Sequence, residues 1–256
     1  MIKAAFFDID GTLLSFHTHR VSDGTVRAFR RLHDAGVRTF ISSGRPLVLI
    51  PPMPVSFEGH ITMNGGLVFT PEATLLSNPI VEEDKQRWLD FAAEHDIATM
   101  LFTADSMMGA QVNDTALRLR DQLEFEMPPI VDIEEMRRHE AYQIIAIMPP
   151  ELDGTVAALM PHSRLPRWTP VFTDIVADGN SKAVGMEVLC RHFGIRQEET
   201  IAFGDGGNDI EMLRWAGIGI AMGNAAPEVQ AAADMVTTSV DEEGIEQAIK
   251  KIIKGQ

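Results

Sequence analysis

Short apolar runs alternate with amphipathic segments at the N-terminal end of the chain. Residues 2–7 are mostly apolar and lead directly into Asp8, which is typical of a buried parallel strand. Ser22 is a suitable N-cap for a helix that ends at Gly36, and residues 37–41 form a second apolar run. Strand, helix and strand with short connections predict a right-handed βαβ unit in a parallel sheet.

The C-terminal third repeats this alternation of apolar runs and helical spacing. The pattern predicts, in order, a helix over 181–193, a strand over 200–203, a short helix ending at Gly217, a strand over 218–222, a helix opened by Pro227, a strand over 235–237 and a last amphipathic helix from Gly244. Together with the N-terminal unit, these elements predict an α/β fold with a doubly wound, Rossmann-like parallel sheet.

The middle of the chain has a different character, because its strand-like runs come in adjacent pairs. The pattern predicts a helix around Trp88, strands over 98–103 and 107–112, a helix from about Asp114, a strand over 142–148, a helix over 153–160, and strands over 165–168 and 171–176. Paired strands favour an antiparallel sheet with helices on one face. We therefore expect a core over 1–81 and 179–256, with an α+β module inserted over 82–178.

Composition and charge exclude several classes of function. The 256 residues carry 37 acidic and 22 basic side chains, a net charge of −15, which argues against nucleic-acid and membrane-surface binding. Cys190 is the only cysteine, so an intrachain disulfide is impossible, and we interpret it as a buried apolar residue. We expect no signal peptide, because the chain leads at once into a strand-like run, and no apolar stretch approaches the length of about 20 residues that a membrane crossing needs. We expect a soluble, cytoplasmic protein without an obligate protein partner.

Polar side chains follow the predicted strands or begin the next helices. In an open parallel sheet, ligands bind beyond the carboxyl ends of the strands. Four clusters stand at such positions: Asp8 with Asp10, the run Ser42-Ser43-Gly44-Arg45, Lys182, and Asp205 with Asn208 and Asp209. If the strands are neighbours in the sheet, all four clusters face one crevice.

The side chains in these clusters suit phosphoryl transfer. Asp8, Asp10 and Asp205 offer the hard oxygen ligands that Mg²⁺ prefers. Lys182, the hydroxyl of Ser43 and the amides of a glycine-containing turn can bind a phosphoryl group. A carboxylate can attack the phosphorus to form an aspartyl-phosphate once Mg²⁺ and lysine offset the repulsion between the anions. The second aspartate can protonate the leaving alcohol and then activate water.

These motifs resemble the haloacid dehalogenase superfamily, and within it the Cof-type sugar-phosphatase subfamily with a C2 (type IIB) cap. The resemblance covers the whole chain, and its four motifs are Asp8-Ile9-Asp10-Gly11-Thr12-Leu13-Leu14, Ser42-Ser43-Gly44-Arg45-Pro46, Gly179-Asn180-Ser181-Lys182 and Gly204-Asp205-Gly206-Gly207-Asn208-Asp209. It implies an Mg²⁺-dependent phosphatase whose inserted cap excludes bulk water and governs substrate choice.

The resemblance also assigns roles to single residues. It implies that Asp8 is the nucleophile, that Asp10 is the general acid and base, and that Lys182 steadies the nucleophile and the phosphoryl oxygens. Ser43 supplies the second motif's hydroxyl, although the adjacent Ser42 offers another. The implied metal-binding residues are Asp8, Asp10 through its carbonyl, Asp205, and Asp209 as a ligand or an orienting carboxylate. The predicted substrate-binding residues are Gly11, Ser43, Gly44, Arg45, Asn64, Lys182 and Asn208.

Several alternatives remain open from the sequence alone. Arg45 could touch the substrate or pair with a carboxylate of the core, and Asn64 could contact the leaving group or only form a turn. We expect hydrolysis of a small phosphorylated metabolite, a sugar phosphate first of all. The alternatives are a sugar phosphomutase or phosphotransferase and a non-catalytic sensor of phosphorylated ligands. His139, Arg167 and Trp168 of the insert are candidates for contact with the leaving group.

Overall fold

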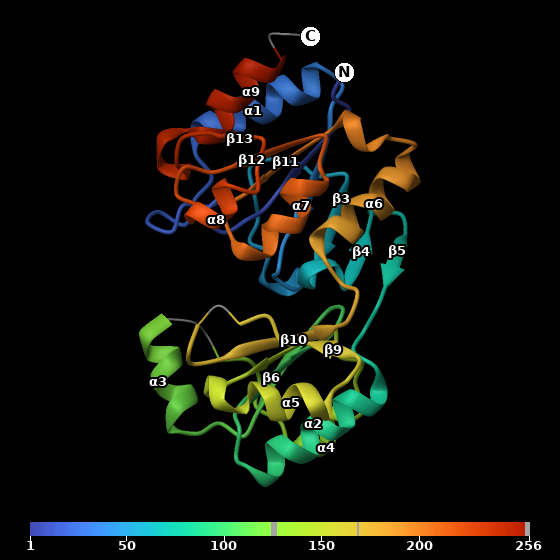
Figure 1. The fold of residues 1–256 in the computed structure, drawn as a ribbon, viewed down its shortest axis with the longest axis vertical. Coiled ribbons are helices and arrows are strands. Elements are labelled where there is room, and N and C mark those ends of the chain that lie inside the picture. The colour runs from blue at the N-terminus through green and yellow to red at the C-terminus, as the bar shows by residue number, and fades with distance from the viewer. Residues whose placement is uncertain (124–126, 168, 254–256) are drawn as a thin grey trace. The chain divides into compact units, whose positions relative to one another are not determined.

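The computed structural model describes residues 1–123, 127–167 and 169–253, which divide into two compact units (Figure 1). Unit 1 comprises Met1–Arg45, Pro51–Ser77 and Ser181–Gln256, and unit 2 comprises Pro46–Ile50 and Asn78–Asn180. Unit 2 covers the region where we expected the inserted module. Among the described residues, no helix combines the length and the apolar composition that a membrane crossing requires.

Unit 1 contains a mixed sheet that is parallel over most of its width. In the described part of the chain it has eight strands: β1 (Ala4–Phe7), β2 (Arg38–Ser42), β3 (Gly59–Thr62), β4 (Leu67–Phe69), β5 (Thr74–Ser77), β11 (Thr200–Gly204), β12 (Ile218–Ala221) and β13 (Met235–Val236). Their order is β13-β12-β11-β1-β2-β3-β4-β5. All pairs from β13 to β3 are parallel, whereas β4 and β5 pair antiparallel.

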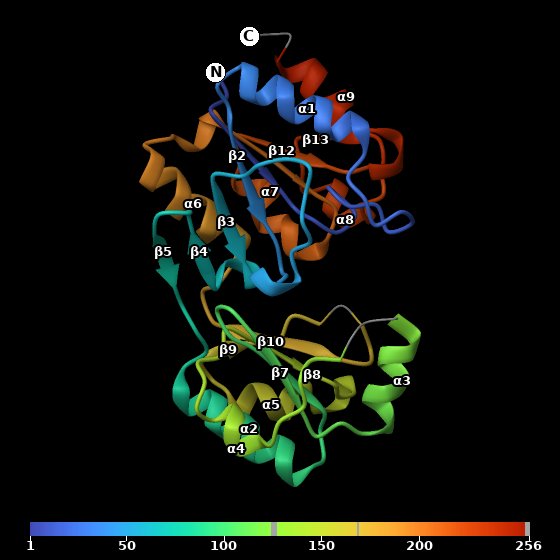
Figure 2. The same ribbon diagram turned by 180° about the vertical axis from the view of Figure 1, so that it is seen from behind.

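Helices cover both faces of this sheet (Figures 1 and 2). They are α1 (Asp23–Asp34), α6 (Lys182–Phe193), α7 (Ile210–Trp215), α8 (Pro227–Gln230) and α9 (Gly244–Ile253), with 3-10 turns η2 (Met63–Gly65), η4 (Gln197–Glu199), η5 (Gly207–Asp209) and η6 (Val240–Glu242). Side chains of α1 and α9 pack in one apolar cluster, and those of α6, α7 and α8 pack in another. The alternation of strand side chains explains this division: Phe6 belongs to the second cluster and Phe7 to the first.

Unit 2 is an antiparallel sheet with helices packed on it. Its described strands are β6 (Thr99–Phe102), β7 (Met107–Ala110), β8 (Gln143–Ala146), β9 (Ser163–Arg164) and β10 (Thr173–Ala177), in the order β7-β6-β8-β10-β9. Its helices are α2 (Glu82–Glu94), α3 (Asp114–Leu123), α4 (Ile133–Met136) and α5 (Asp153–Leu159), with turns η1 (Leu47–Leu49) and η3 (Pro150–Leu152). Trp88 of α2 and Val156 of α5 pack with Leu101, Ile144 and Ile175 of the sheet in one apolar cluster.

The fold class predicted from the sequence is confirmed, with local differences. The strand predicted over 165–168 is wrong for 165–167, which are not in a strand, and Trp168 lies outside the described residues. Pro166 has no N–H to donate to a sheet ladder, and the strand instead occupies Ser163–Arg164. The strands β4 and β5 were not predicted from the sequence.

Helix α6 packs closely on β3, and this packing leaves no room for a side chain at Gly185. A Cβ atom on Gly185 would lie 2.5 Å from Cγ2 of Ile61, which is closer than real contacts allow. Gly185→Ala should therefore lower the free energy of unfolding by about 1–2 kcal/mol, because overpacking costs about 1–3 kcal/mol and the better helix propensity of alanine returns at most about 1 kcal/mol.

Gly154 of α5 provides the matched control, since a Cβ there would meet nothing within 4 Å. Urea unfolding of both variants is the measurement, and we expect Gly154→Ala to be neutral or stabilising by about 0.5–1 kcal/mol. Equal effects of the two substitutions would contradict the proposed packing constraint at Gly185.

Candidate active site

The predicted residues meet beyond the carboxyl ends of three neighbouring strands. Asp8 directly follows β1, Ser43 follows β2 and Asp205 follows β11, and β1 pairs with both of the other strands. Lys182 is the first residue of α6, whose N-cap Ser181 accepts a hydrogen bond from the N–H of Val184. This edge of the sheet is where open α/β folds bind ligands.

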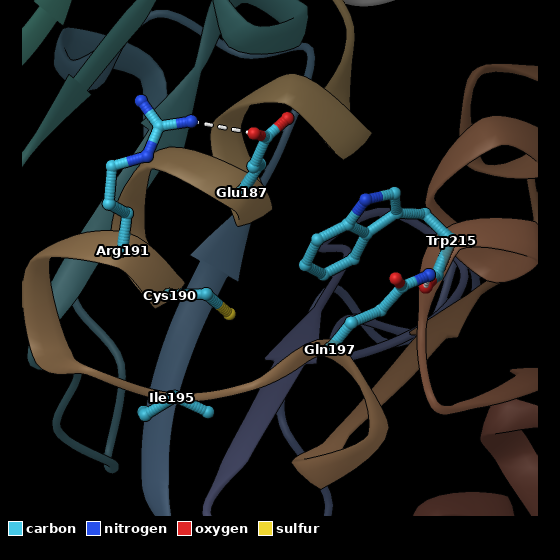
Figure 3. A pocket seen from close by; sticks show the side chains of 6 residues that line it. All are labelled: Glu187, Cys190, Arg191, Ile195, Gln197 and Trp215. Carbon is cyan, nitrogen blue, oxygen red and sulfur yellow. Dashed lines mark hydrogen bonds and ion pairs between the residues drawn. The ribbon is translucent and has the colours of Figure 1, made fainter.

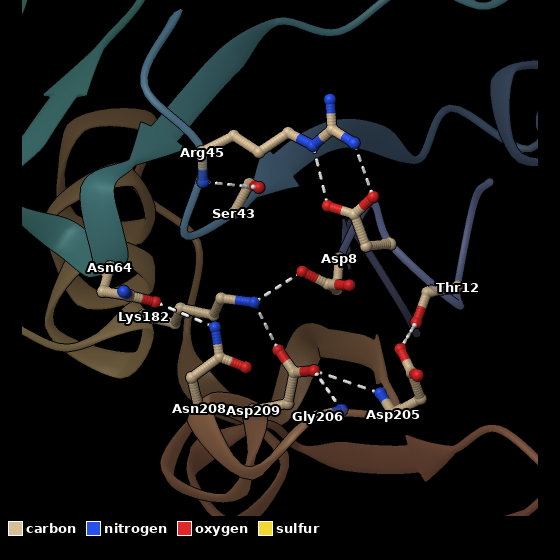
Figure 4. Close-up of polar contacts among 11 residues, drawn as sticks. Asp8, Thr12, Ser43, Arg45, Asn64, Lys182, Asp205, Gly206, Asn208 and Asp209 are labelled. Carbon is tan, nitrogen blue, oxygen red and sulfur yellow. Dashed lines mark hydrogen bonds and ion pairs between the residues drawn. The ribbon is translucent and has the colours of Figure 1, made fainter. Parts of the chain in front are cut away.

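Lys182 joins two carboxylates at the centre of the site. Its Nζ lies 2.6 Å from Oδ1 of Asp8 and 2.6 Å from Oδ1 of Asp209, and Figure 4 shows the ammonium group between them. Lys182 and Asp209 are fully buried, and Asp8 is 6% exposed. Burial alone would lower the pKa of Lys182, but Asp209 and Asp8 outweigh it and raise the pKa above its ordinary value. Lys182 is therefore a permanent positive charge in the site.

Asp209 has both carboxylate oxygens engaged by the protein. Oδ1 accepts a hydrogen bond from Lys182, and Oδ2 accepts hydrogen bonds from the backbone N–H groups of Asp205 (3.0 Å) and Gly206 (2.9 Å). Gly204 permits this approach, because a Cβ there would lie 2.5 Å from Cβ of Asp209. The arrangement gives Asp209 the geometry of an orienting carboxylate that fixes both Lys182 and the turn carrying Asp205.

Three carboxylates share this space with one lysine. Oxygen atoms of Asp8, Asp205 and Asp209 all lie within 4.8 Å of one another. Burial raises the pKa of Asp8 well above its ordinary value, with Lys182 only partly offsetting it, and burial likewise raises the pKa of Asp205 to about 6. Three carboxyl groups face one ammonium group here, and a divalent cation would both use their oxygen atoms as ligands and stabilise their charged forms.

Arg45 pairs with Asp10, which is one of the two alternatives left open by the sequence. Its Nε lies 2.7 Å from Oδ2 of Asp10, and its Nη2 lies 2.7 Å from Oδ1. This two-pronged geometry is the strongest form of arginine–carboxylate contact. The side chain of Arg45 is 34% exposed and that of Asp10 is 40% exposed, and the Asp10 carboxylate is held by Arg45 and not by Lys182.

The two candidate hydroxyls of the second motif have different surroundings. The Oγ of Ser43 accepts the backbone N–H of Arg45 at 3.0 Å, which leaves the proton of the hydroxyl available to a ligand. The Oγ of Ser42 is buried and has no hydrogen-bond partner among the described residues. The geometry therefore favours Ser43 as the hydroxyl that faces the site (Figure 4).

Asn64, Asn208 and Gly44 lie together beside the carboxylates. Nδ2 of Asn208 donates to Oδ1 of Asn64 at 2.9 Å, and a Cβ on Gly44 would lie 3.2–3.4 Å from these two amides. Asn64 has a left-handed backbone with φ 53°, between Met63 at φ 49° and Gly65 at φ 93°. Two successive non-glycine residues in this region store strain of about 1–3 kcal/mol each, which is typical of functional sites.

Two residues in direct contact with the site received no role in the sequence analysis. Thr12 and Asn224 both donate hydrogen bonds to the carboxylate of Asp205. Gly11, a predicted substrate-binding residue, donates its N–H to the carbonyl of Leu14, and its carbonyl accepts a hydrogen bond from Asn224. Asn224 follows β12, so the strand-end rule could have found it, although it lacks the charge that drew attention to the aspartates.

The candidates of unit 2 are engaged within that unit. The guanidinium of Arg167 binds the carboxylate of Asp153 and the carbonyls of Met148, Thr169 and Phe172. The ring of His139 lies 3.2 Å from the carboxylate of Glu135. Trp168 lies outside the described residues. Contact of these side chains with a leaving group stays a prediction.

A surface pocket against α6 and α7 offers no comparable chemistry. It is lined by Glu187, Cys190, Arg191, Ile195, Gln197 and Trp215 (Figure 3). Arg191 and Glu187 form an ion pair of 2.6 Å, and Gln197 donates to the carbonyl of Trp215. Burial raises the pKa of the Cys190 thiol to about 12, so the group stays protonated and is a poor nucleophile. The chemistry of unit 1 is concentrated around Lys182.

Comparison with known proteins agrees with this geometry. The family model of haloacid dehalogenase-like hydrolases matches residues 5–249. A putative phosphatase of Bacillus subtilis strain 168, YkrA, is 34% identical over 256 residues, which cover 98% of this chain and 97% of that protein.

Solved structures give the same result. BT1666, a phosphatase of Bacteroides thetaiotaomicron, superposes with a TM-score of 0.89 at 36% identity, over 98% of this chain and 95% of that one. The subclass IIB sugar phosphatase BT4131 superposes with a TM-score of 0.87 at 37% identity, over 98% of both chains. The resemblance predicted from the four motifs is thereby confirmed, and the chain belongs to the haloacid dehalogenase-like hydrolases.

Proposed function

We propose that this protein is an Mg²⁺-dependent phosphatase that hydrolyses small sugar phosphates through an aspartyl-phosphate on Asp8. The observation that carries the proposal is the buried contact of Lys182 with Asp8 and Asp209, next to Asp205. A non-catalytic sensor would not need an intact nucleophile, acid–base group and cation site together.

The divalent cation would be held by Asp8 and Asp205, with the carbonyl of Asp10 as the further ligand that the family resemblance implies. The excess negative charge of the three carboxylates supports this assignment. When bound, the cation would reduce the repulsion between the attacking carboxylate and the phosphate and stabilise charge on the phosphoryl oxygens. The oxygens of Asp209 accept hydrogen bonds from Lys182 and from two backbone N–H groups, so Asp209 would hold the metal ligands in position.

Asp8 would form a bond to phosphorus while the bond to the leaving oxygen breaks. Its Oδ1 binds Lys182, whereas its Oδ2 has no hydrogen-bond partner among the described residues and is available for attack. Lys182, held positive by its two carboxylates, would bind the phosphoryl oxygens alongside the hydroxyl of Ser43. Gly44 and the Asn64–Asn208 pair would contribute further contacts at the same edge.

Asp10 would transfer the protons of both half-reactions. It would give a proton to the leaving alkoxide and then take one from the water that attacks the phosphorus of the aspartyl-phosphate, which releases phosphate and restores Asp8. Arg45 donates one hydrogen bond to each oxygen of Asp10, and each oxygen keeps a further lone pair that can carry the transferred proton. We therefore assign Arg45 the role of orienting Asp10, in preference to a role in contacting the substrate.

Two relatives support sugar phosphates as the substrate class. BT4131 is a sugar phosphatase, and YitU of Bacillus subtilis strain 168, 28% identical over 95% of this chain, acts on a phosphorylated ribityl compound according to its name. Both kinds of leaving group are small polyhydroxy compounds. Unit 2, with its separate apolar core, is our candidate for the part that selects among them.

Substitution of Asp8 tests the nucleophile. Asp8→Asn should lower kcat for p-nitrophenyl phosphate by about 10⁴-fold or more, because the amide cannot form the aspartyl-phosphate. Asp34→Asn, on an exposed position of α1, is the control and should keep normal turnover. If folded Asp8→Asn protein hydrolysed this substrate at the normal rate, the assigned nucleophile would be wrong.

Removal of the cation tests the second part of the proposal. EDTA followed by desalting should silence the enzyme, and added Mg²⁺ should restore the activity and raise Tm, because a ligand that binds only the folded state stabilises it. Phosphate release and thermal unfolding are measured on the same samples. Full activity after chelation, without any response to Mg²⁺, would remove the metal from the mechanism.

The fate of the phosphoryl group separates hydrolysis from sugar phosphotransfer. Phosphorylated enzyme, chased with water alone or with added unphosphorylated sugar, should release inorganic phosphate at a rate that the sugar does not change. Rapid quench and chromatography of the products measure both routes. Transfer to the sugar that is much faster than phosphate release would favour the phosphomutase alternative.

A further inference from the structure

The carboxylate of Asp205 is held by two side chains that the proposed reaction does not use. Oγ1 of Thr12 donates to its Oδ1 at 2.9 Å, and Nδ2 of Asn224 donates to its Oδ2 at 3.1 Å. Each oxygen therefore has its own donor, from two different loops. Two donors on opposite oxygens fix the rotation of a carboxylate more strictly than either does alone.

Asn224 also connects Asp205 with two other segments. Its Nδ2 donates to the carbonyl of Gly11 at 2.9 Å, and its Oδ1 accepts the N–H of Val240 at 3.0 Å. Both hydrogens of the amide and its oxygen thus have partners, and these partners determine which way the amide faces. One neutral side chain holds together the loop that follows Asp8, the carboxylate of Asp205 and the start of η6.

The backbone of Gly11 lies so close to the Asp205 carboxylate that no side chain would fit between them. Gly11 has φ +79°, and a Cβ there would lie 2.1 Å from Oδ2 of Asp205. The loop that follows Asp8 therefore packs directly against the Asp205 carboxylate, and Asn224 ties the two together at the point of contact. Without these donors, repulsion from Asp8 and Asp209 would favour rotation of the half-buried Asp205 carboxylate toward water.

We propose that Asn224 and Thr12 are positioning residues that hold Asp205 ready for the divalent cation and so set the cation affinity of the site. The proposal rests on the cation assigned in the proposed function. Neither side chain need touch the cation or the substrate, and both donate to an anionic ligand without adding charge. Partners of this kind commonly change metal affinity by about 10–100-fold when they are removed.

The test is the Kd for Mg²⁺, measured by calorimetry on folded, metal-stripped protein without substrate. Asn224→Ala should weaken Mg²⁺ binding by about 10–100-fold. Its matched control is Asn113→Ala in unit 2, where Asn113 accepts the N–H groups of Thr115 and Ala116 and donates to the carbonyl of Asp96. The control should lose thermal stability but keep the Kd of the unchanged protein.

Thr12→Val provides a second variant in case Asn224→Ala does not fold, and it should also weaken Mg²⁺ binding. Thr237→Val is its control, because Oγ1 of Thr237 donates to the carbonyl of Gly244 and contacts none of the carboxylates. The rise in Tm at a fixed Mg²⁺ concentration is the second readout. It should shrink in Thr12→Val and stay unchanged in Thr237→Val, whatever the Tm of each metal-free variant.

The outcomes separate the two proposals. An unchanged Mg²⁺ Kd in folded Asn224→Ala and Thr12→Val would overturn the positioning role while leaving the phosphatase proposal intact. Absence of Mg²⁺ binding by the unchanged protein would instead remove the cation from the proposed function, and the positioning role with it. Weakened binding in both variants, with normal binding in both controls, is the result that supports the inference.

Discussion

The site depends on one interaction, the buried contact of the Lys182 ammonium group with the carboxylates of Asp8 and Asp209. Removing charges from water is costly, and the cost is offset only when the charges pair closely and their remaining atoms have partners. Here Asp209 meets that condition through two backbone N–H groups, whereas one oxygen of Asp8 has no hydrogen-bond partner among the described residues. The asymmetry separates a structural carboxylate from a reactive one.

The fold supplies this contact by bringing distant segments to one edge of a sheet. Asp8 follows β1, Asp205 follows the neighbouring β11, and Lys182 begins α6, which packs on the same sheet. Small residues permit the approach: a Cβ on Gly65 would lie 2.2 Å from the carbonyl oxygen of Ser181, directly before Lys182. The same packing that builds the apolar core therefore sets the positions of the charged groups within it.

Much of this arrangement was predictable because it follows from strand ends. Asp8, Ser43 and Asp205 each stand within two residues of the end of an apolar run, so a parallel sheet had to bring them close if its strands were neighbours. The partner of Arg45 was not predictable, since its pairing with Asp10 depends on side-chain conformation. Asn224 was missed although it also follows a strand, because it lacks the charge that drew attention to the aspartates. The strand predicted over 165–168 is absent at 165–167, because Pro166 has no N–H to donate to a sheet ladder.

The central claim is that Asp8 becomes covalently phosphorylated, and the most direct test locates the phosphoryl group on the chain. The enzyme would be mixed with a sugar phosphate and Mg²⁺, quenched in acid within one turnover, digested and analysed by peptide mass spectrometry. The account predicts a phosphorylated peptide that contains Asp8, with the acid-stable, base-labile behaviour of an acyl phosphate. Phosphate on another residue, or turnover without any phosphorylated peptide when the quench is demonstrably faster than its hydrolysis, would contradict it.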